Sequence, residues 1–143
     1  MAIDEVKALE RRLRNYSYFK NEKIRLEEEI KHCYDSLGAS PHSPAFGSEP
    51  IHSPKNLDRE YETREKIEDL LKEKTLVESE LRYLDSVLAN VADDLTKPIY
   101  EAYVLNKPMN AVRKRYGYSY GGLYKALHRE LERIIESGKN ISK

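Results

Sequence analysis

Two long segments without proline or glycine constrain the fold of this chain more than any other feature. They cover residues 1–37 and 55–97. Apolar residues recur in both at steps of three and four, the spacing that places side chains on one face of an α-helix. These positions are Val6, Leu9, Leu13, Tyr16, Phe19, Leu26, Ile30, Cys33 and Leu37, and then Ile67, Leu70, Val77, Leu81, Leu84, Leu88, Val91 and Leu95. The sequence therefore predicts two long amphipathic helices, the first with a change of phase near Phe19.

The stretch between the two helices, residues 38–56, holds four of the six prolines and two of the six glycines, which predicts a loop. Ser53 fits an N-cap, and Pro54 fits the first position of the second helix, where its missing N–H costs nothing. Two long helices joined by a loop form an antiparallel, coiled-coil-like hairpin. We expect this hairpin to cover residues 1–95 and to use its uncovered apolar stripe for oligomerisation or partner binding, for example in a homodimer.

Residues 96–137 have the pattern of three shorter helices. We expect them at Thr96 to Leu105 with Thr96 as N-cap, at Pro108 or Met109 to Tyr116 before Gly117, and at Ser119 to Gly138 with Ser119 as N-cap. A short helix, a turn containing glycine and a longer amphipathic helix form a helix-turn-helix, whose last helix enters the major groove of DNA. The predicted fold is all-α, a helical hairpin followed by a three-helix DNA-binding domain, with residues 138–143 as a flexible tail.

The charges of the chain cancel, because 25 basic residues face 25 acidic ones. They are unevenly distributed. Residues 97–143 contain ten basic and four acidic residues, a net charge of +6, which leaves residues 1–96 with 15 basic and 21 acidic residues, a net charge of −6. A neutral protein offers no overall field that attracts a polyanion. A basic C-terminal module beside an acidic hairpin instead indicates a nucleic-acid partner at one end.

Two sets of residues follow as candidates for contacts with double-stranded DNA. The exposed residues at the N-terminal end of the third short helix would meet base edges in the major groove. These are Tyr120, Gly121, Tyr124, Lys125 and His128. Polar and basic side chains around the turn would hold phosphates. These are Lys107, Arg113, Lys114, Arg115, Ser119 and Arg129.

Two glycines stand where the first turn of that helix is expected. Relative to alanine, Gly121 and Gly122 together weaken a helix by about 1–2 kcal/mol. A functional explanation, either close approach of the backbone to DNA or a helix end that becomes ordered on binding, and neutral drift account for them equally well. Four other tyrosines of this region are expected to build a small core rather than to touch DNA. These are Tyr100, Tyr103, Tyr116 and Tyr118.

Several classes of protein find no support in the sequence. Cys33 is the only cysteine, so no internal disulfide can form and the cytoplasm is the expected compartment. The apolar runs are too short for a membrane span, and the N-terminus is too charged for a secretion signal. No nucleophile–base pair, metal-ligand spacing or phosphate-binding glycine motif is present, and Asp93-Asp94 fits the first turn of a helix better than a cation site. We expect no enzyme, no metal and no cofactor.

Motifs along nearly the whole chain carry a family resemblance. They are Tyr16, Lys20, Lys23-Ile24 and residues 26–30 in the first helix, the proline-containing loop at residues 40–54, the second long helix, and Gly117-Tyr118-Ser119 before the last helix. In these motifs the chain resembles the ArpU/RinA-type late-gene transcriptional regulators of phages and prophages. The spacing from Val112 through Tyr116 and Gly117 to Leu123 is similar to the turn in region 4 of bacterial sigma factors.

The resemblance implies a sequence-specific activator of phage late genes for structural and lysis proteins, acting with host RNA polymerase at a late promoter in the bacterial cytoplasm. The family commonly has Arg or Thr after the serine, whereas this chain has Tyr120-Gly121-Gly122, so the recognised DNA sequence does not carry over. Two alternatives stay open. One is a DNA-packaging protein resembling a small terminase subunit, and the other is a helical interaction module that binds no DNA.

Overall fold

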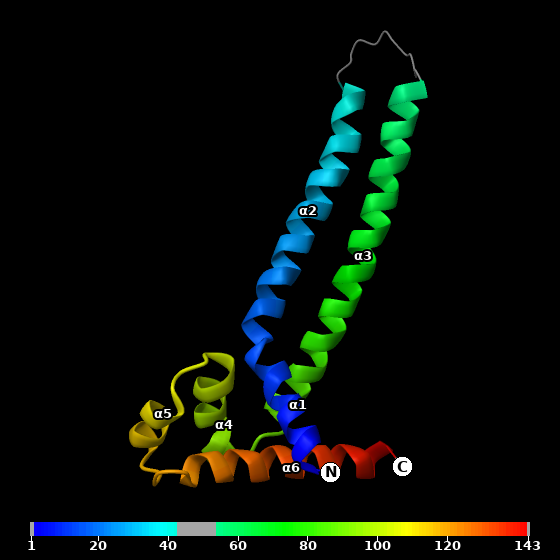
Figure 1. The fold of residues 1–143 in the computed structure, drawn as a ribbon. Helices are drawn as coiled ribbons and strands as arrows, with labels where there is room; N and C mark the ends of the chain where they lie inside the picture. Colours follow the sequence, from blue (N-terminus) through cyan, green and yellow to red (C-terminus); the bar gives the residue numbers. More distant parts are fainter. Residues whose placement is uncertain (1, 43–53, 143) are drawn as a thin grey trace. The chain divides into compact units, whose positions relative to one another are not determined.

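The computed structural model describes residues 2–42 and 54–142, and every regular element in these ranges is a helix (Figure 1). The predicted all-α class is therefore confirmed for the described residues. The elements are α1 (Ala2–Arg14), α2 (Tyr16–His42), α3 (Pro54–Ala89), α4 (Asp93–Ile99), the π-helix η2 (Tyr100–Val104), α5 (Met109–Tyr116) and α6 (Gly122–Ser142). None of the helices in the described ranges is both long and apolar enough to cross a membrane.

Contacts within the chain divide it into two compact units. The two-helix unit is Lys20–Ser79, and the multi-helix unit combines Met1–Phe19 with Glu80–Lys143. The hairpin was expected to end at residue 95, a position that lies inside the multi-helix unit. The N-terminal helix and the end of α3 thus pack with the C-terminal helices.

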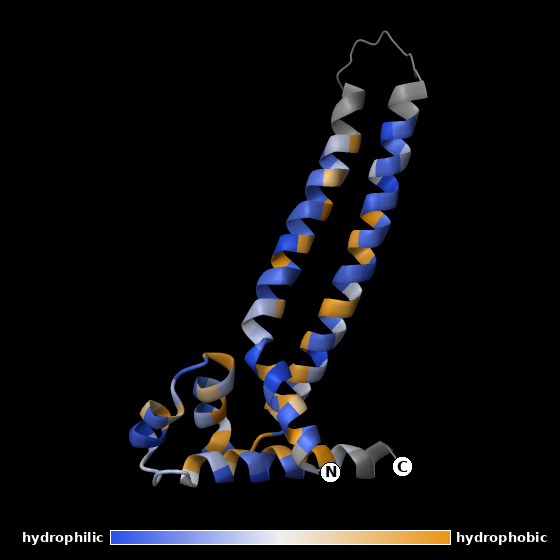
Figure 2. Ribbon diagram, in the orientation of Figure 1, coloured by the Kyte–Doolittle hydropathy of each residue, from blue (hydrophilic) through white to orange (hydrophobic). Residues whose placement is uncertain are grey.

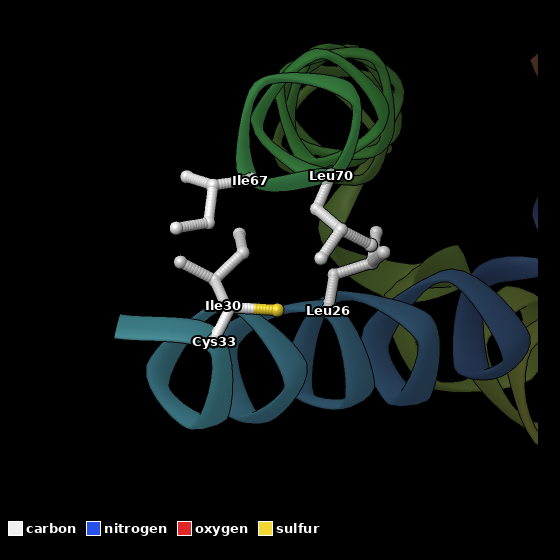
Figure 3. Packing of buried hydrophobic residues seen from close by; sticks show 5 residues of the cluster. All are labelled: Leu26, Ile30, Cys33, Ile67 and Leu70. Atoms are coloured by element: carbon white, nitrogen blue, oxygen red, sulfur yellow. The ribbon is translucent and has the colours of Figure 1, made fainter. Parts of the chain in front are cut away.

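The two-helix unit is held together by one apolar seam. Leu26, Ile30 and Cys33 of α2 pack against Ile67 and Leu70 of α3, and all five are buried (Figure 3). Figure 2 shows many of the apolar residues of the two helices on the sides that face each other, although Ile24, Leu71 and Leu76 are exposed. The three-and-four spacing of the sequence therefore places these residues as expected.

Ion pairs flank the seam of the two-helix unit. Lys23 Nζ lies 3.6 Å from a carboxylate oxygen of Glu78, and Lys74 Nζ lies 3.5 Å from one of Glu27. The order of these pairs makes α2 and α3 antiparallel in this unit. Each pair is partly exposed to solvent and contributes at most about 1 kcal/mol, so burial of the seam provides most of the stability.

The core of the multi-helix unit lies where α1 crosses α6 and η2 (Figure 1). Its largest completely or almost completely buried side chains are Leu13, Leu84, Ile99, Tyr103, Leu123, Leu127 and Leu131. They come from α1, the end of α3, α4, η2 and α6. The core therefore needs both ends of the sequence, and α1 closes a core that the C-terminal helices alone leave open.

The first predicted helix is interrupted. Helix α1 ends at Arg14 and α2 begins at Tyr16, so the break falls at Asn15 rather than at the phase change near Phe19. The backbone N–H of Asn15 still donates to the carbonyl of Arg12, 3.1 Å away. The side chain of Tyr16 is buried and donates a hydrogen bond to Asp85 of α3.

Other predicted boundaries also shift. Helix α4 begins at Asp93, and Thr96 lies inside it, where its hydroxyl donates to the carbonyl of Ala92 instead of capping the helix. The predicted helix from Thr96 to Leu105 is in fact α4 followed by a π-helical turn, in which the N–H of Leu105 donates to the carbonyl of Tyr100. Helix α6 continues past Gly138 to Ser142, so the expected tail begins inside a helix.

Both ends of the predicted loop at residues 38–56 are helical in the structure. Helix α2 continues to His42, and α3 begins at Pro54, the predicted first position. The expected N-cap, Ser53, lies outside the described residues. A proline at the first position of a helix loses no hydrogen bond, which explains why the helix starts there.

Candidate nucleic-acid interface

Helix α5 ends in a tight left-handed turn. Gly117 has a φ of 75°, a conformation that glycine adopts without steric cost. The N–H of Tyr118 donates to the carbonyl of Arg113 at 2.8 Å, and the N–H of Gly117 donates to that of Lys114 at 3.4 Å. These two bonds form a Schellman motif, which satisfies carbonyls at the helix end. The predicted end of this helix at Tyr116 is correct.

Helix α6 begins later than expected. Gly121 has a φ of 80°, which excludes it from a right-handed helix, so the first helical residue is Gly122. Ser119 is therefore not the N-cap. Its carbonyl instead accepts the N–H of Gly122 at 2.9 Å, and its Oγ lies 2.5 Å from where a Cβ on Gly122 would stand. The two glycines thus form a turn into α6.

Buried side chains fix α5 against α6. Val112 on α5 and Leu123 and Leu127 on α6 have exposed fractions of 1% or less. Ala126 and Tyr116 are half-buried at the same contact. These residues are the inner face that the sequence pattern predicted for the second and third short helices.

The side chain of Arg113 makes several contacts within the turn. Its Nε donates to Asn110 at 2.6 Å, and one terminal nitrogen lies 3.4 Å from the carbonyl oxygen of Tyr118. Its guanidinium also lies 5.6 Å from the ring centre of Tyr120. A phosphate would compete with these contacts, so the geometry gives Arg113 a positioning role in addition to the predicted phosphate contact.

Glu101 forms ion pairs with two of the residues predicted to bind phosphates. Its carboxylate accepts a hydrogen bond from Tyr116 and lies 3.4 Å from Lys107 Nζ and 3.6 Å from Arg115 Nε. The Tyr116 hydroxyl, helped by the two cations, holds the pKa of the Glu101 carboxyl below its ordinary value. The same bond raises the pKa of Tyr116. Lys107 and Arg115 are therefore partly neutralised, and they are weaker candidates for phosphates than their charge alone suggests.

The remaining candidates lie on the surface. Tyr120 is 87% exposed and Tyr124 is 43% exposed. The side chains of Lys114, Lys125 and Arg129 are exposed and make no ion pair or hydrogen bond with the described part of the chain. Their charges are thus uncompensated at the end of α5 and in the first two turns of α6.

His128 faces the interior of the multi-helix unit. Its Nε2 lies 3.0 Å from a carboxylate oxygen of Glu10, and its ring stacks on Tyr124 with 4.0 Å between ring centres. Although the distance to Glu10 is short, Nε2 of His128 is buried and makes no hydrogen bond with the described residues. A residue held this way against α1 does not project into a groove of DNA. The predicted base contact by His128 does not fit this orientation.

The sequence reasoning missed basic residues on α1. Lys7, Arg11 and Arg14 line a shallow hollow of about 380 Å³ together with Glu10 and Tyr124. The sequence placed α1 in the acidic hairpin, so these three basic residues contributed to the net charge of the hairpin and not to that of the basic C-terminal domain. Their spacing of four and three residues places them on one helical face, but nothing in the sequence shows that this face lies beside α6.

Comparison with protein-family models, with curated proteins and with solved structures finds no match to this chain. Among the described residues, no three His, Cys, Asp or Glu side chains lie together as a metal site would require. The resemblance seen in the sequence therefore stays a prediction, and the surface around α5 and α6 remains the candidate site.

Proposed function

We propose that the chain is a sequence-specific DNA-binding transcription activator with a helix-turn-helix formed by α5, the turn at residues 117–121 and α6. In this proposal α2 and α3 form the predicted antiparallel hairpin. The observation that carries the proposal is the set of uncompensated cations and exposed tyrosines at the end of α5, in the turn and at the start of α6. They are Lys114, Tyr120, Tyr124, Lys125 and Arg129.

The chemistry of this surface suits duplex DNA. Lysine and arginine side chains without internal partners are available for phosphates, and aromatic and lysine side chains on a helix can meet base edges. Beyond the first two turns the exposed side chains of α6 are of mixed sign, with Glu132 beside Arg133. The uniform positive charge of Lys125 and Arg129 therefore favours contact through the N-terminal half of α6, as in known helix-turn-helix complexes.

The genes controlled are proposed from the resemblance. The motifs shared with ArpU/RinA-type regulators favour activation of phage or prophage late genes together with host RNA polymerase. Transcription in vitro from a late promoter, with purified bacterial RNA polymerase and with or without this protein, tests that part of the proposal. An increase in transcripts supports it, and an unchanged yield contradicts it.

Binding to duplex DNA is tested first. Titration of a labelled random-sequence duplex should show an affinity that falls steeply with salt, because each phosphate contact releases counterions. Selection from a random duplex pool should then enrich one motif. The absence of binding at low salt would contradict the proposal and leave the protein-interaction alternative.

Two matched variants separate base contacts from phosphate contacts. Lys125→Ala should change the enriched motif, whereas Lys114→Ala should weaken binding to all duplexes alike and lower the salt slope by about 0.9. Both side chains are exposed, so neither variant disturbs the core. Equal, sequence-independent losses from both would remove α6 as the recognition helix.

A further inference from the structure

A row of basic side chains on α1 lies beside the N-terminal half of α6. Lys7, Arg11 and Arg14 are all exposed and share the hollow that Tyr124 of α6 closes. Figure 1 shows α1 lying across α6. Lys7 and Arg11 make no side-chain ion pair or hydrogen bond with the described part of the chain. This surface therefore carries positive charge next to a proposed base contact.

The acid in the hollow, Glu10, is turned inward. It accepts a hydrogen bond from the buried hydroxyl of Tyr103 at 2.7 Å, and its other oxygen lies 3.0 Å from His128 Nε2. The residue as a whole is only 9% exposed. Because both oxygens face interior groups, Glu10 does not pair with the neighbouring cations. The basic side chains of the hollow are therefore exposed to solvent, whereas its carboxylate is buried.

Arg14 fixes the end of α1 to the loop before α5. Its NH1 donates to the side-chain oxygen of Asn106 at 3.1 Å, and the side-chain nitrogen of Asn106 donates to the carbonyl of Arg14 at 3.1 Å. Asn106 has a φ of 55°, a conformation that asparagine tolerates better than most residues. The row on α1 is thus held in place relative to the loop that leads into α5.

We infer that α1 supplies a second set of contacts to the backbone phosphates of duplex DNA, through Lys7 and Arg11, beside the duplex face that α6 contacts. The inference rests on the proposed function. Phosphates fit these residues because a flexible ammonium and a guanidinium, both without internal partners, hold anions without reading sequence. Contact with DNA through α1 also explains why uncompensated cations stand on a segment that packs with the basic C-terminal helices.

The test is the salt dependence of binding to a labelled random-sequence duplex. The double variant Lys7→Ala/Arg11→Ala should lower the slope of log Kd against log salt by about 1.8, since each lost phosphate contact removes about 0.9. Its motif in selection from a random pool should stay that of the unaltered protein. The matched control, Lys31→Ala/Lys72→Ala, removes the same charge from exposed positions of the two-helix unit and should leave the slope unchanged.

Three results would overturn the inference, and they differ from failure of the proposed function. A slope unchanged in the α1 variant, while Lys114→Ala lowers it, removes α1 from the interface and leaves α6 in place. An equal drop in the control variant attributes the effect to net charge alone. An unchanged slope together with lost binding to poly-glutamate assigns the row to an acidic protein partner. If the unaltered protein binds no duplex at low salt, the proposed function fails as well.

Discussion

Substitution by alanine should change the stability of the protein in opposite directions at Gly121 and at Gly138. Gly121 has a φ of 80°, whereas Gly138 lies inside α6 with no neighbouring atom where a Cβ would stand. An alanine forced into the left-handed region costs roughly 1–2 kcal/mol. An alanine in a helix gains about 0.5–1 kcal/mol over glycine. The sign of the effect therefore reports the backbone conformation at each position.

Gly121→Ala should lower the free energy of unfolding by about 1 kcal/mol, and Gly138→Ala should raise it by about 0.5–1 kcal/mol. Urea unfolding followed by circular dichroism measures both. Gly121→Asn is the control, because asparagine tolerates a positive φ and should recover part of the loss. A stabilising Gly121→Ala would show that this residue is helical and that α6 begins earlier, as the sequence predicted.

Tyr103 is a second residue whose role depends on its surroundings. Its side chain is completely buried, and burial, followed by the hydrogen bond to Glu10, raises the pKa of its hydroxyl. Tyr103→Phe keeps the ring but leaves the Glu10 carboxylate buried without its donor. We expect a loss of about 1–3 kcal/mol in the free energy of unfolding, the usual cost of an unsatisfied buried polar group. Tyr100→Phe, at a half-exposed position, should change the stability by less than about 0.5 kcal/mol.

At the scale of elements, α6 fixes the start of α4. Glu130 of α6 accepts the N–H of Ala92, the N-cap residue of α4, at 2.7 Å, and Arg133 donates to the carbonyl of Asn90 at 2.8 Å. Arg133 also donates to Glu130 at 2.6 Å. These bonds satisfy backbone groups between α3 and α4 that have no helical partner. The acidic pair Asp93-Asp94 lies in the first turn of α4, where the helix dipole favours it.

This arrangement predicts a loss of stability in acid. The hydrogen bond from Arg133, with that from Ala92, holds the pKa of Glu130 below its ordinary value. The hydrogen bond from Tyr116 likewise lowers the pKa of Glu101. A carboxylate with a lowered pKa stabilises the fold above its ordinary pKa, and this contribution is lost as the pH falls through the lowered value. The free energy of unfolding should be level from about pH 7 to 5 and fall below that.

Urea unfolding at a series of pH values measures this dependence. Glu130→Gln keeps an acceptor for Ala92 but removes the charge, so it should flatten part of the acid branch. The control is Glu132→Gln, because Glu132 is exposed and makes no hydrogen bond or ion pair with the described residues. An acid branch equally steep in both variants would mean that Glu130 does not cause it.

Periodicity predicted the helices well and their ends poorly. The apolar positions Leu26, Ile30, Ile67 and Leu70 are buried as their spacing indicated, because a heptad-like stripe has few alternatives to a neighbouring helix. The start of α6 was missed since the φ of Gly121 is set by the turn and not by any local preference of glycine. The break at Asn15 was not predicted, because the apolar spacing runs through it and indicated one helix with a change of phase near Phe19.

The candidate site shows the same limit. Lys125 and Tyr120 are exposed as their positions after the turn suggested, whereas His128 faces Glu10, 118 residues away in sequence. The position of Lys7, Arg11 and Arg14 beside α6 could not be predicted either, because it also depends on a contact between distant helices. Contacts between sequence-distant helices decide both cases, and a local pattern contains no information about them.

For the whole molecule, the distribution of charge changes once the units are known. The multi-helix unit contains 15 basic and 11 acidic residues, a net charge of +4, and the two-helix unit contains 10 basic and 14 acidic residues, a net charge of −4. A split at residue 97 had given +6 and −6. The contrast is smaller because residues 80–96 bring a net charge of −3 to the basic unit, which outweighs the net charge of +1 that residues 1–19 bring. Under the proposed function, DNA would be attracted to the multi-helix unit, although the chain as a whole is neutral.

Two units with separate cores also predict separate stabilities. The seam of the two-helix unit is narrow, whereas the multi-helix unit buries residues from α1, α3, α4, η2 and α6. Leu70→Ala should destabilise the two-helix unit by about 2–5 kcal/mol, because Leu70 is buried in its seam. Amide hydrogens around Leu26 and Ile67 should then exchange faster, while those of α6 keep their protection and affinity for a random-sequence duplex is unchanged. Leu127→Ala, in the core of the multi-helix unit, should instead speed exchange in α6 and leave the protection around Leu26 and Ile67 unchanged. Faster exchange throughout the chain in the Leu70→Ala variant would show that the two units unfold together.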